Sequence, residues 1–316
     1  MKIAIYGYGN VGKAVERMAR YFPDIETAAI FSHRKVEAES AVPVLPCAQT
    51  EEAKGKIDVM INCGGSAVNL PITTPMLAAN FNVIDSFDTH GKIAEHIEKT
   101  DKAARGGDNI AMVSAGWDPG LFSIARLAFS SFITDGDTYT LWGRGVSQGH
   151  SDAIRNIDGV EDARQYTVPS QEAIRRILGG EKIEDAHALH VRECYVVPYP
   201  GADTEKIEKS IRTMPDYFAG YNTEIHFIDK DTMKKEHSTY PHAGRVIRNG
   251  KAGYNTFSAE FCLSMSSNPC FTASVMLAYA RAIHRMYLNG ERGCKTVFDI
   301  PMSLLAEDME SIYKYL

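Results

Sequence analysis

The chain has 316 residues, of which 44% are hydrophobic and 23% charged, and its formal net charge is −6 at pH 7. This length predicts about two domains with sizeable buried cores, and the acidic balance disfavours nucleic acid and anionic membrane surfaces as partners. No apolar run approaches the roughly 18 residues of a membrane-spanning helix, and the six scattered cysteines include no CxxC pair, so we expect a cytoplasmic protein without a disulfide framework or a zinc site.

The first 115 residues alternate short apolar runs with helical patterns. Apolar residues between Val11 and Ala19 recur at the spacing of one helix face. Continuous apolar strands interleaved with helices indicate a parallel sheet covered on both faces. We therefore predict an α/β fold with an N-terminal Rossmann-type, doubly wound domain over residues 1–118. Its expected strands lie at residues 3–6, 27–31, 58–63, 82–85 and 110–114.

The middle of the chain has a different pattern. Segments rich in β-forming residues are separated by turn signals, which predicts a mixed α+β domain over residues 119–264. Asn268-Pro269 opens a long, alanine-rich helix that ends near Tyr287, and we expect the C-terminal helices, residues 265–316, to pack back on the first domain. The β-rich segments are residues 139–142, 189–197, 224–228, 244–247 and 254–263.

A glycine-rich loop follows the first predicted strand. It matches GxGxxG, and it opens a helix that leads to a second strand, which is the context that a dinucleotide-binding loop requires. The first glycine allows the tight turn, the second a close approach of the pyrophosphate, and the third close packing of helix on strand. The helix N-terminus then attracts the phosphates. The candidate residues are Gly7, Gly9, Asn10, Val11 and Gly12.

The end of the second strand distinguishes the two nicotinamide cofactors. An NAD site would place a carboxylate there for the ribose 2′-hydroxyl. This chain has Ser32-His33-Arg34-Lys35 instead, and no carboxylate occurs until Glu37. Cationic side chains suit a 2′-phosphate, so the pattern favours NADP, with Arg34 as the main discriminator. An exposed basic turn is the alternative interpretation.

Polar loops also follow the third, fourth and fifth strands, at the sheet edge where ligands of this architecture gather. They are residues 63–67, 85–90 and 114–120. Asp88 and Asp118 are candidate functional carboxylates in the second and third of these loops, and each could equally be a helix cap.

A GxSxG string, the nucleophile motif of serine hydrolases, occurs at Gly145-Val146-Ser147-Gln148-Gly149, with His150 and Asp152 just beyond it. A hydrolase needs its acid and histidine on later strands, so we favour a ligand-lining glycine loop with Trp142 as an apolar wall, and a hydrolase remains the less favoured alternative. His187 and His190 are close in sequence, but we expect solvent-facing histidines and no metal site.

The chain resembles the meso-diaminopimelate dehydrogenase family along essentially its whole length. The resemblance is carried by Tyr6-Gly7-Tyr8-Gly9-Asn10, Phe31-Ser32-His33-Arg34, residues 114–123 (SAGWDPGLFS), Trp142-Gly143, residues 147–152 (SQGHSD), residues 212–218 (RTMPDYF), Asn268-Pro269 and Phe271-Thr272-Ala273-Ser274. It implies an NADP-dependent homodimeric enzyme of lysine and cell-wall precursor synthesis, with a dinucleotide-binding domain over residues 1–118 and a substrate-binding and dimerisation domain over residues 119–264. The implied reaction converts the D-centre of meso-2,6-diaminopimelate, reversibly, to L-2-amino-6-oxopimelate and ammonia.

The resemblance also implies site residues. From the chemistry of these residues we expect Asp118, or a water that it holds, to accept the proton of the amine. Asp88 is the second candidate catalytic residue, and both carboxylates can hold an ammonium group. Arg192 would hold the distal carboxylate in a forked pair. A non-catalytic nucleotide sensor with the same fold is the alternative. The implied cofactor positions are Gly7, Gly9, Asn10, Val11, Gly12, Ser32, His33, Arg34, Gly65, Ser66, Ala67, Asp88, Gly116, Trp117, Asp118, Pro119 and Gly120. The implied substrate positions are Asp88, Asp118, Trp142, Gln148, Gly149, Thr167, Arg192, His242 and Asn268.

Overall fold

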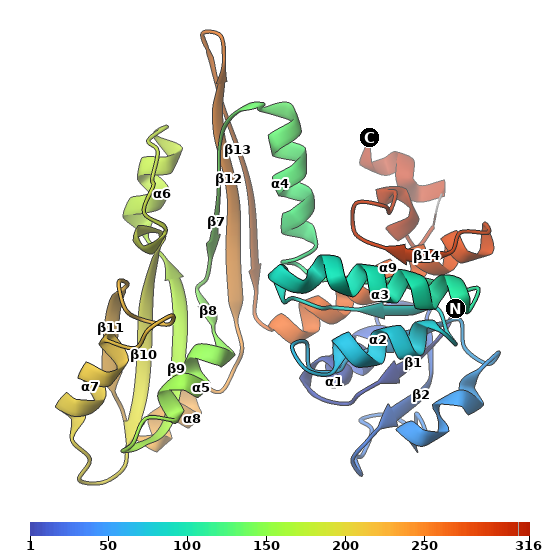
Figure 1. The fold of residues 1–316 in the computed structure, drawn as a ribbon, viewed down its shortest axis with the longest axis horizontal. Helices are drawn as coiled ribbons and strands as arrows, with labels where there is room; N and C mark the ends of the chain where they lie inside the picture. Colours follow the sequence, from blue (N-terminus) through green and yellow to red (C-terminus); the bar gives the residue numbers. More distant parts are fainter. Residues whose placement is uncertain (309) are drawn as a thin grey trace. The chain divides into compact units, whose positions relative to one another are not determined.

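The computed structural model describes residues 1–308 and 310–316 (Figure 1). The chain forms two compact units. Unit 1 comprises Met1–Ile124 and Pro269–Leu316, and unit 2 comprises Ala125–Asn268. The functional roles of the two predicted domains remain predictions. In the described part of the chain, no helix combines the length and the apolar character that crossing a membrane requires.

Unit 1 contains a seven-stranded sheet in which all neighbouring strands are parallel. From β1 the chain runs outward in one direction to β2 and β3, and then returns to the other side of β1. The carboxyl ends of β1 and β4 therefore lie at a topological switch point, where ligands of such sheets bind. In spatial order the strands are β14 (Gly293–Lys295), β6 (Ile110–Met112), β5 (Val83–Asp85), β4 (Val59–Asn62), β1 (Lys2–Tyr6), β2 (Glu26–Ser32) and β3 (Val44–Pro46).

Helices cover both faces of this sheet, as predicted. Alternate residues of β1 point to opposite sides, so Ile3 and Ile5 join one core cluster while Ala4 and Tyr6 join another. The first cluster includes buried residues of α1 and α9, and the second includes residues of α2 and α3. The long predicted helix is confirmed as α9, which is part of the core of unit 1. The bounds are α1 (Asn10–Ala19), α2 (Leu70–Ala78), α3 (Ile93–Gly106) and α9 (Asn268–Leu288).

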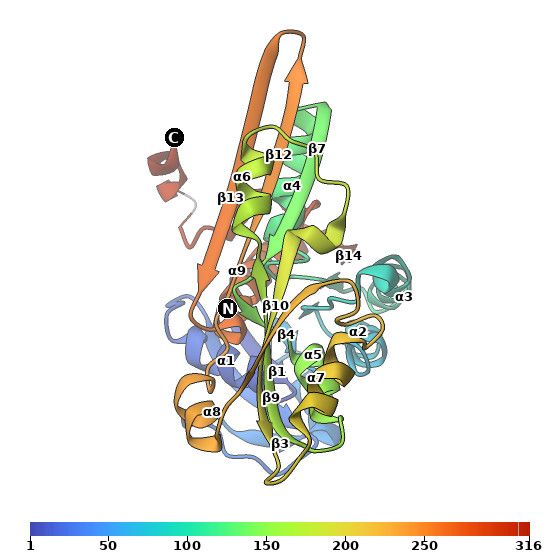
Figure 2. The same cartoon turned by 90° about the vertical axis from the view of Figure 1, so that its left-hand side faces the viewer.

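Unit 2 contains two sheets, which confirms the mixed α+β prediction. The strands β13 (Asn255–Met265), β12 (His242–Ala252) and β7 (Asp135–Trp142) form an antiparallel sheet with a long hairpin (Figure 2). The other sheet has the order β11-β10-β9-β8, in which only the pair β10 and β11 is parallel. Its strands are β11 (Asn222–Phe227), β10 (His190–Pro198), β9 (Val160–Pro169) and β8 (Gly145–Val146).

Five further α-helices complete the described part of the chain. Residues of α5 and α7 share a buried cluster with β9 and β10, so these helices cover one face of the four-stranded sheet. The helices are α4 (Leu121–Phe132), α5 (Gln148–Arg155), α6 (Gln171–Leu178), α7 (Thr204–Arg212) and α8 (Lys230–Glu236), and short 3₁₀ turns lie at Cys47–Ala53, His90–Lys92, Ala186–Leu189, Met302–Leu305 and Glu310–Tyr315.

The burial of α9 leads to a test of unit 1. Met276 is fully buried in the cluster that α9 shares with β1, so Met276→Ala leaves a cavity and should lower the free energy of unfolding by about 2–5 kcal/mol. Leu288→Ala, at an exposed position of the same helix, should change it by less than about 0.5 kcal/mol. Denaturant titration measures both values. Equal unfolding midpoints for the two variants would contradict the packing of α9 in the core.

Candidate functional site

The glycine loop of unit 1 connects β1 to α1. A Cβ atom on Gly12 would lie 2.2 Å from the carbonyl oxygen of Gly7, so the close contact between helix and loop requires glycine there. Gly9 is the N-cap of α1 and has no side chain to cap the first helical turn, which leaves backbone N–H groups for an anion. The Cys63 N–H donates to the Tyr6 carbonyl at 2.7 Å, which brings the next loop to the same sheet edge.

A hollow of about 640 Å³ lies beside this loop. Arg34 is among its lining residues, as the predicted role in cofactor selection requires. Lys13 also lines the hollow, and it was not among the residues predicted from the sequence. It lies in the first turn of α1, directly after the glycine motif, which is the signal that could have found it. Three cationic side chains and one carboxylate make the hollow suitable for a phosphate group. The lining residues are Tyr8, Lys13, Arg34, Lys35, Val36 and Glu37.

Ser32 and His33, the other predicted contacts of the 2′-phosphate, have partners within the protein. The Ser32 hydroxyl donates to the Arg34 carbonyl at 2.8 Å and accepts the Arg34 N–H at 3.1 Å, so it shapes the turn that carries Arg34. His33 Nε2 lies 3.3 Å from the Tyr6 hydroxyl. Burial, with a smaller contribution from Cys47, raises the pKa of Tyr6 to about 12. Direct cofactor contacts of Ser32 and His33 remain predictions.

Asp85, at the end of β5, connects two of the predicted functional loops. It is fully buried, and its Oδ1 accepts the backbone N–H groups of Phe87 and Ser114, each at 3.0 Å. Its Oδ2 accepts the Thr74 hydroxyl at 2.7 Å and lies 2.6 Å from His96 Nε2. One carboxylate thereby fixes the starts of the loops that carry Asp88 and Asp118. This role was not predicted from the sequence, although a charged residue at the end of an apolar strand was a signal for it.

Asp88 is held by Ser66, another predicted site residue. The Ser66 hydroxyl donates to Asp88 Oδ1 at 2.5 Å and accepts the Asp88 N–H at 2.9 Å, so the loops after β4 and β5 meet. The neighbouring helical turns have Thr89 and Lys92 as N-caps, and the hypothesis that Asp88 is a helix cap is therefore wrong.

Asp118 lies in the segment that precedes α4. In this segment Gly116 and Gly120 form a β-bridge, and the Leu121 N–H donates to the Gly116 carbonyl at 3.2 Å. The buried Trp117 ring packs edge to face on Phe122. The predicted loop from Gly116 to Gly120 is thus a compact turn that follows β6 at the carboxyl edge of the sheet.

A row of predicted residues crosses the four-stranded sheet of unit 2. The register pairs Gly145 with Thr167 and Thr167 with Arg192. Arg192 is 8% exposed; its Nη1 donates to the Thr167 hydroxyl at 2.7 Å, and its guanidinium lies 4.1 Å from the Tyr221 ring centre. Burial lowers the pKa of Arg192, and Tyr221 opposes this effect.

No ion pair joins Arg192 to a carboxylate within residues 1–308 and 310–316, and its buried Nε has no hydrogen-bond partner there. A buried guanidinium without an acidic partner is costly, and a bound anion would compensate it. The arrangement of Arg192 and Thr167 is therefore that of a preformed anion-binding site.

His242 lies at one end of this row. A Cβ atom on Gly145 would lie 2.4 Å from its ring, so only glycine at this position permits the contact. Burial lowers the pKa of His242, and its Nδ1 lies 2.9 Å from the Ala243 carbonyl.

The remaining predicted substrate residues of unit 2 lie in other elements. Gln148 and Gly149 are the first two residues of α5. Asn268 is the first residue of α9, and its backbone N–H donates to the Tyr240 carbonyl at 3.0 Å.

Trp142 packs on His190. The backbone N–H of Trp142 donates to His190 Nε2 at 2.9 Å, and the indole and imidazole rings stack with their centres 5.6 Å apart. Burial, followed by the charge of Arg192, lowers the pKa of His190 to about 4. The expectation that His190 faces solvent is wrong, because a neutral imidazole can accept this N–H and stack in the interior. His187, in contrast, is about half exposed.

The serine of the GxSxG motif does contact the histidine that follows the motif. Ser147 Oγ lies 2.7 Å from His150 Nδ1. A catalytic triad needs a carboxylate on the other ring nitrogen, but His150 Nε2 has no hydrogen-bond partner in the described chain, and Asp152 pairs with Arg155. Burial, then Arg192, also lowers the pKa of His150 to about 4, which makes it a weak general base. This geometry does not support the hydrolase alternative.

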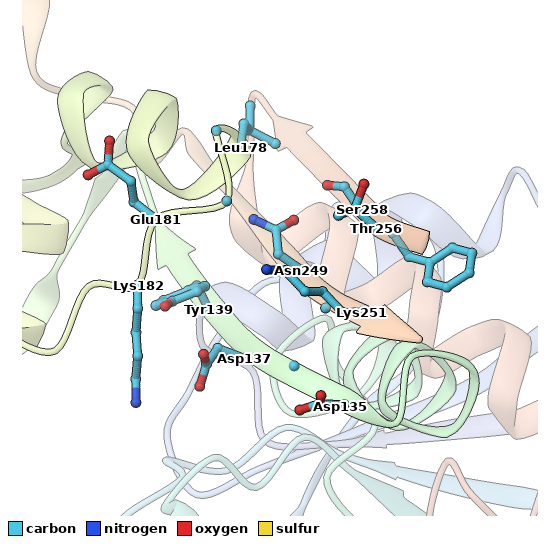
Figure 3. A pocket seen from close by; sticks show the side chains of 15 residues that line it. Asp135, Asp137, Tyr139, Leu178, Glu181, Lys182, Asn249, Lys251, Thr256 and Ser258 are labelled. Atoms are coloured by element: carbon cyan, nitrogen blue, oxygen red, sulfur yellow. The ribbon is translucent and has the colours of Figure 1, made fainter. Parts of the chain in front are cut away.

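A cavity of about 420 Å³ in unit 2 lies beside β7, the end of α6 and the β12–β13 hairpin (Figure 3). Figure 3 shows Asp135 and Asp137 on β7 and Lys251 on β12 among the side chains around it. Its lining includes no predicted site residue, no histidine and no cysteine. Across the described residues, no group of three or more histidine, cysteine or acidic side chains is arranged to hold a metal ion.

The two buried histidines predict a pH dependence of stability. The pKa values of His150 and His190 are near 4 in the folded protein, against 6.5 ordinarily. The unfolded chain therefore binds protons at these residues between pH 6.5 and 4 while the folded chain does not, so their stabilisation is complete above pH 6.5 and is lost as the pH falls toward 4.

We expect the midpoint of denaturant unfolding to fall over this pH range. The variant His190→Gln, whose amide oxygen can still accept the Trp142 N–H, should show a smaller fall, while His187→Gln should behave like the wild type. An unchanged pH slope in His190→Gln would show that this histidine does not cause it.

Comparisons with known proteins agree with this geometry. The family model of the diaminopimelic acid dehydrogenase C-terminal domain matches residues 116–267. The meso-diaminopimelate D-dehydrogenase of Ureibacillus thermosphaericus is 48% identical over 312 residues, covering 97% of this chain and 95% of that protein. A solved meso-DAP dehydrogenase mutant from Clostridium tetani with DAP is 44% identical, with a TM-score of 0.93 over 100% of this chain and 99% of that chain. An engineered D-amino acid dehydrogenase bound to NADP+ is 38% identical, with a TM-score of 0.86 over 100% and 99% of the two chains. This chain belongs to the meso-diaminopimelate D-dehydrogenase family.

Proposed function

We propose that this protein catalyses the reversible, NADP-dependent oxidative deamination of the D-centre of meso-2,6-diaminopimelate to L-2-amino-6-oxopimelate and ammonia. The observation that carries the proposal is the buried Arg192, which donates to Thr167 and has no acidic partner in the described chain. A dicarboxylate substrate supplies the missing anion. The similar proteins named for this activity, which match nearly the whole chain, support the same substrate.

The substrate carries two carboxylates and two ammonium groups, so it needs binding groups of both signs. In this proposal Arg192, Thr167 and His242 hold the distal carboxylate through charge-assisted and neutral hydrogen bonds. Asp88 and Asp118 hold an ammonium group. Trp142 provides an apolar surface beside the row, and Gln148, Gly149 and Asn268 provide further polar contacts.

The residues of unit 1 fit an NADP molecule. The uncapped N-terminus of α1 suits the pyrophosphate, and the cationic hollow with Lys13, Arg34 and Lys35 suits the 2′-phosphate. NADP, when bound, supplies the hydride acceptor at its nicotinamide. The loop residues Gly65, Ser66, Ala67 and Asp88 and the turn from Gly116 to Gly120 would contact the nicotinamide half.

The protein's own chemical task is to position one Cα–H bond and to receive a proton from the amine. We assign the proton acceptor to Asp118 or to a water that it holds. Asp88, whose carboxylate is oriented by the Ser66 hydroxyl, holds the ammonium group in place. Asp85 fixes the backbone that carries both carboxylates.

The proposal includes a homodimer and a place in lysine and cell-wall precursor synthesis. The dimer is supported by one feature of unit 2. The strand β13 is at the edge of its sheet, and Tyr254 and Phe257 on the hairpin are exposed. Exposed edge strands with apolar side chains are favourable surfaces for pairing with another chain.

The direct test is an assay with NADP and diaminopimelate isomers, followed by the absorbance of the reduced nicotinamide. We expect reduction with the meso isomer and none with the LL isomer. Arg192→Lys keeps the charge but loses the forked geometry, so the KM for diaminopimelate should rise about 10–100-fold while the KM for NADP is unchanged. NADP binding without turnover of the meso isomer would instead indicate a nucleotide sensor.

The cationic hollow predicts the cofactor preference. Lys13→Gln and Arg34→Gln should each lower kcat/KM for NADP by about 10–100-fold and leave kcat/KM for NAD nearly unchanged, because each loses one charge-assisted contact with the 2′-phosphate. Arg20→Gln, an equal change of charge at the other end of α1, is the matched control. Parallel losses with both cofactors would contradict a role in 2′-phosphate recognition.

A further inference from the structure

A buried carboxylate in unit 1, Glu16 on α1, has no place in the functions assigned above. It is 4% exposed, and both of its oxygens accept hydrogen bonds. Oε1 accepts the backbone N–H and the hydroxyl of Ser40, at 2.8 and 2.5 Å. Oε2 accepts the Glu39 N–H at 3.2 Å and the Tyr8 hydroxyl. The donors come from two segments that are far apart in the sequence.

Both of these segments include or adjoin residues that line the cationic hollow. Tyr8 belongs to the glycine loop and lines the hollow, with the Lys13 ammonium 5.9 Å from its ring centre. Glu39 and Ser40 lie in the same irregular segment, residues 33–43, as Arg34 and Lys35, which also line the hollow. Glu16 therefore connects the glycine loop to the basic segment, and it is itself not one of the lining residues.

The basic segment depends on such contacts. Between β2 and β3, residues 33–43 form no helix or strand, so side-chain contacts must hold this segment in place. Ser32 fixes the turn at Arg34, and Glu16 fixes the later part of the segment through Glu39 and Ser40. Burial alone would raise the pKa of Glu16, but the hydrogen bonds from Ser40, Tyr8 and the backbone N–H groups lower it below its ordinary value. The carboxylate thus stays ionised at neutral pH and holds all four donors.

We propose that Glu16 is a positioning residue for cofactor selection, which holds Arg34 and Lys35 at the hollow that Lys13 also lines and so sets the preference for a 2′-phosphate. It acts through Tyr8 and Ser40 and does not touch the phosphate. This inference rests on the proposed use of NADP and names a residue that controls it. A second tie between the same elements, the ion pair of Arg17 with Glu39, is exposed, and exposed pairs contribute little.

The test measures binding of 2′,5′-ADP and of 5′-ADP by calorimetry, and kcat and KM with NADP. In the wild type 2′,5′-ADP should bind more tightly. In Glu16→Gln this preference should fall about tenfold and the KM for NADP should rise by a similar factor, while kcat at saturating NADP is unchanged. Ser40→Ala, which removes one donor at an exposed position, should produce a smaller change in the same direction.

Arg17→Gln is the matched control, because it breaks the exposed tie between the same helix and the same segment. It should leave the preference within twofold of the wild type. The inference is overturned if Glu16→Gln and Ser40→Ala both keep the wild-type preference, or if Arg17→Gln lowers it as much as they do. Should Glu16→Gln fail to fold, Ser40→Ala alone decides. A wild type with no preference for 2′,5′-ADP would refute the proposed cofactor, which is a separate outcome.

Discussion

The loops at the carboxyl edge of the sheet in unit 1 depend on the hydrogen bonds of one buried carboxylate, that of Asp85. Parallel strands can align the starts of their loops, but they do not fix the loops beyond the last ladder hydrogen bond. Asp85 does so by accepting N–H groups from the loops after β5 and β6 and by contacting His96 on α3 and Thr74 on α2. Removing this acceptor would leave several buried donors without a hydrogen bond, and each of them would add to the loss of folding free energy.

Glu16 also orders two loop segments by accepting their hydrogen bonds, on the other side of the topological switch point. Each carboxylate offers two oxygens that can accept several hydrogen bonds, so one side chain can order two irregular segments at once. Both carboxylates are satisfied by donors of the protein. The guanidinium of Arg192 is the opposite case, since its charge is buried without an acidic partner in the described chain. Satisfied buried charges order the backbone, whereas the uncompensated one is suited to a ligand.

Much of the fold could be predicted from the sequence, while the assigned roles of the site residues remain predictions. Apolar periodicity indicated five of the seven strands of unit 1 and the helix α9, and the glycine spacing indicated the turn at Gly12, whereas the three-residue strands β3 and β14 were not predicted. The strand β9 was missed because its buried positions include Gln165 and Thr167, which break the apolar pattern. His190 was expected at the surface, because its sequence neighbours do not reveal the indole and backbone of Trp142 that cover it.

The sequence by itself determined what depends on near neighbours: the strand and helix periods, the glycine turn with its helix N-terminus, and the absence of a carboxylate beside Arg34. Only the tertiary structure decided which distant groups meet. Lys13 joins Arg34 at the hollow, Thr167 meets Arg192 through strand register, and Ser40 meets Glu16 through a folded loop. The physical reason is that these contacts join residues well separated in the chain, and their partners are selected by burial and hydrogen-bond geometry, which no local pattern encodes.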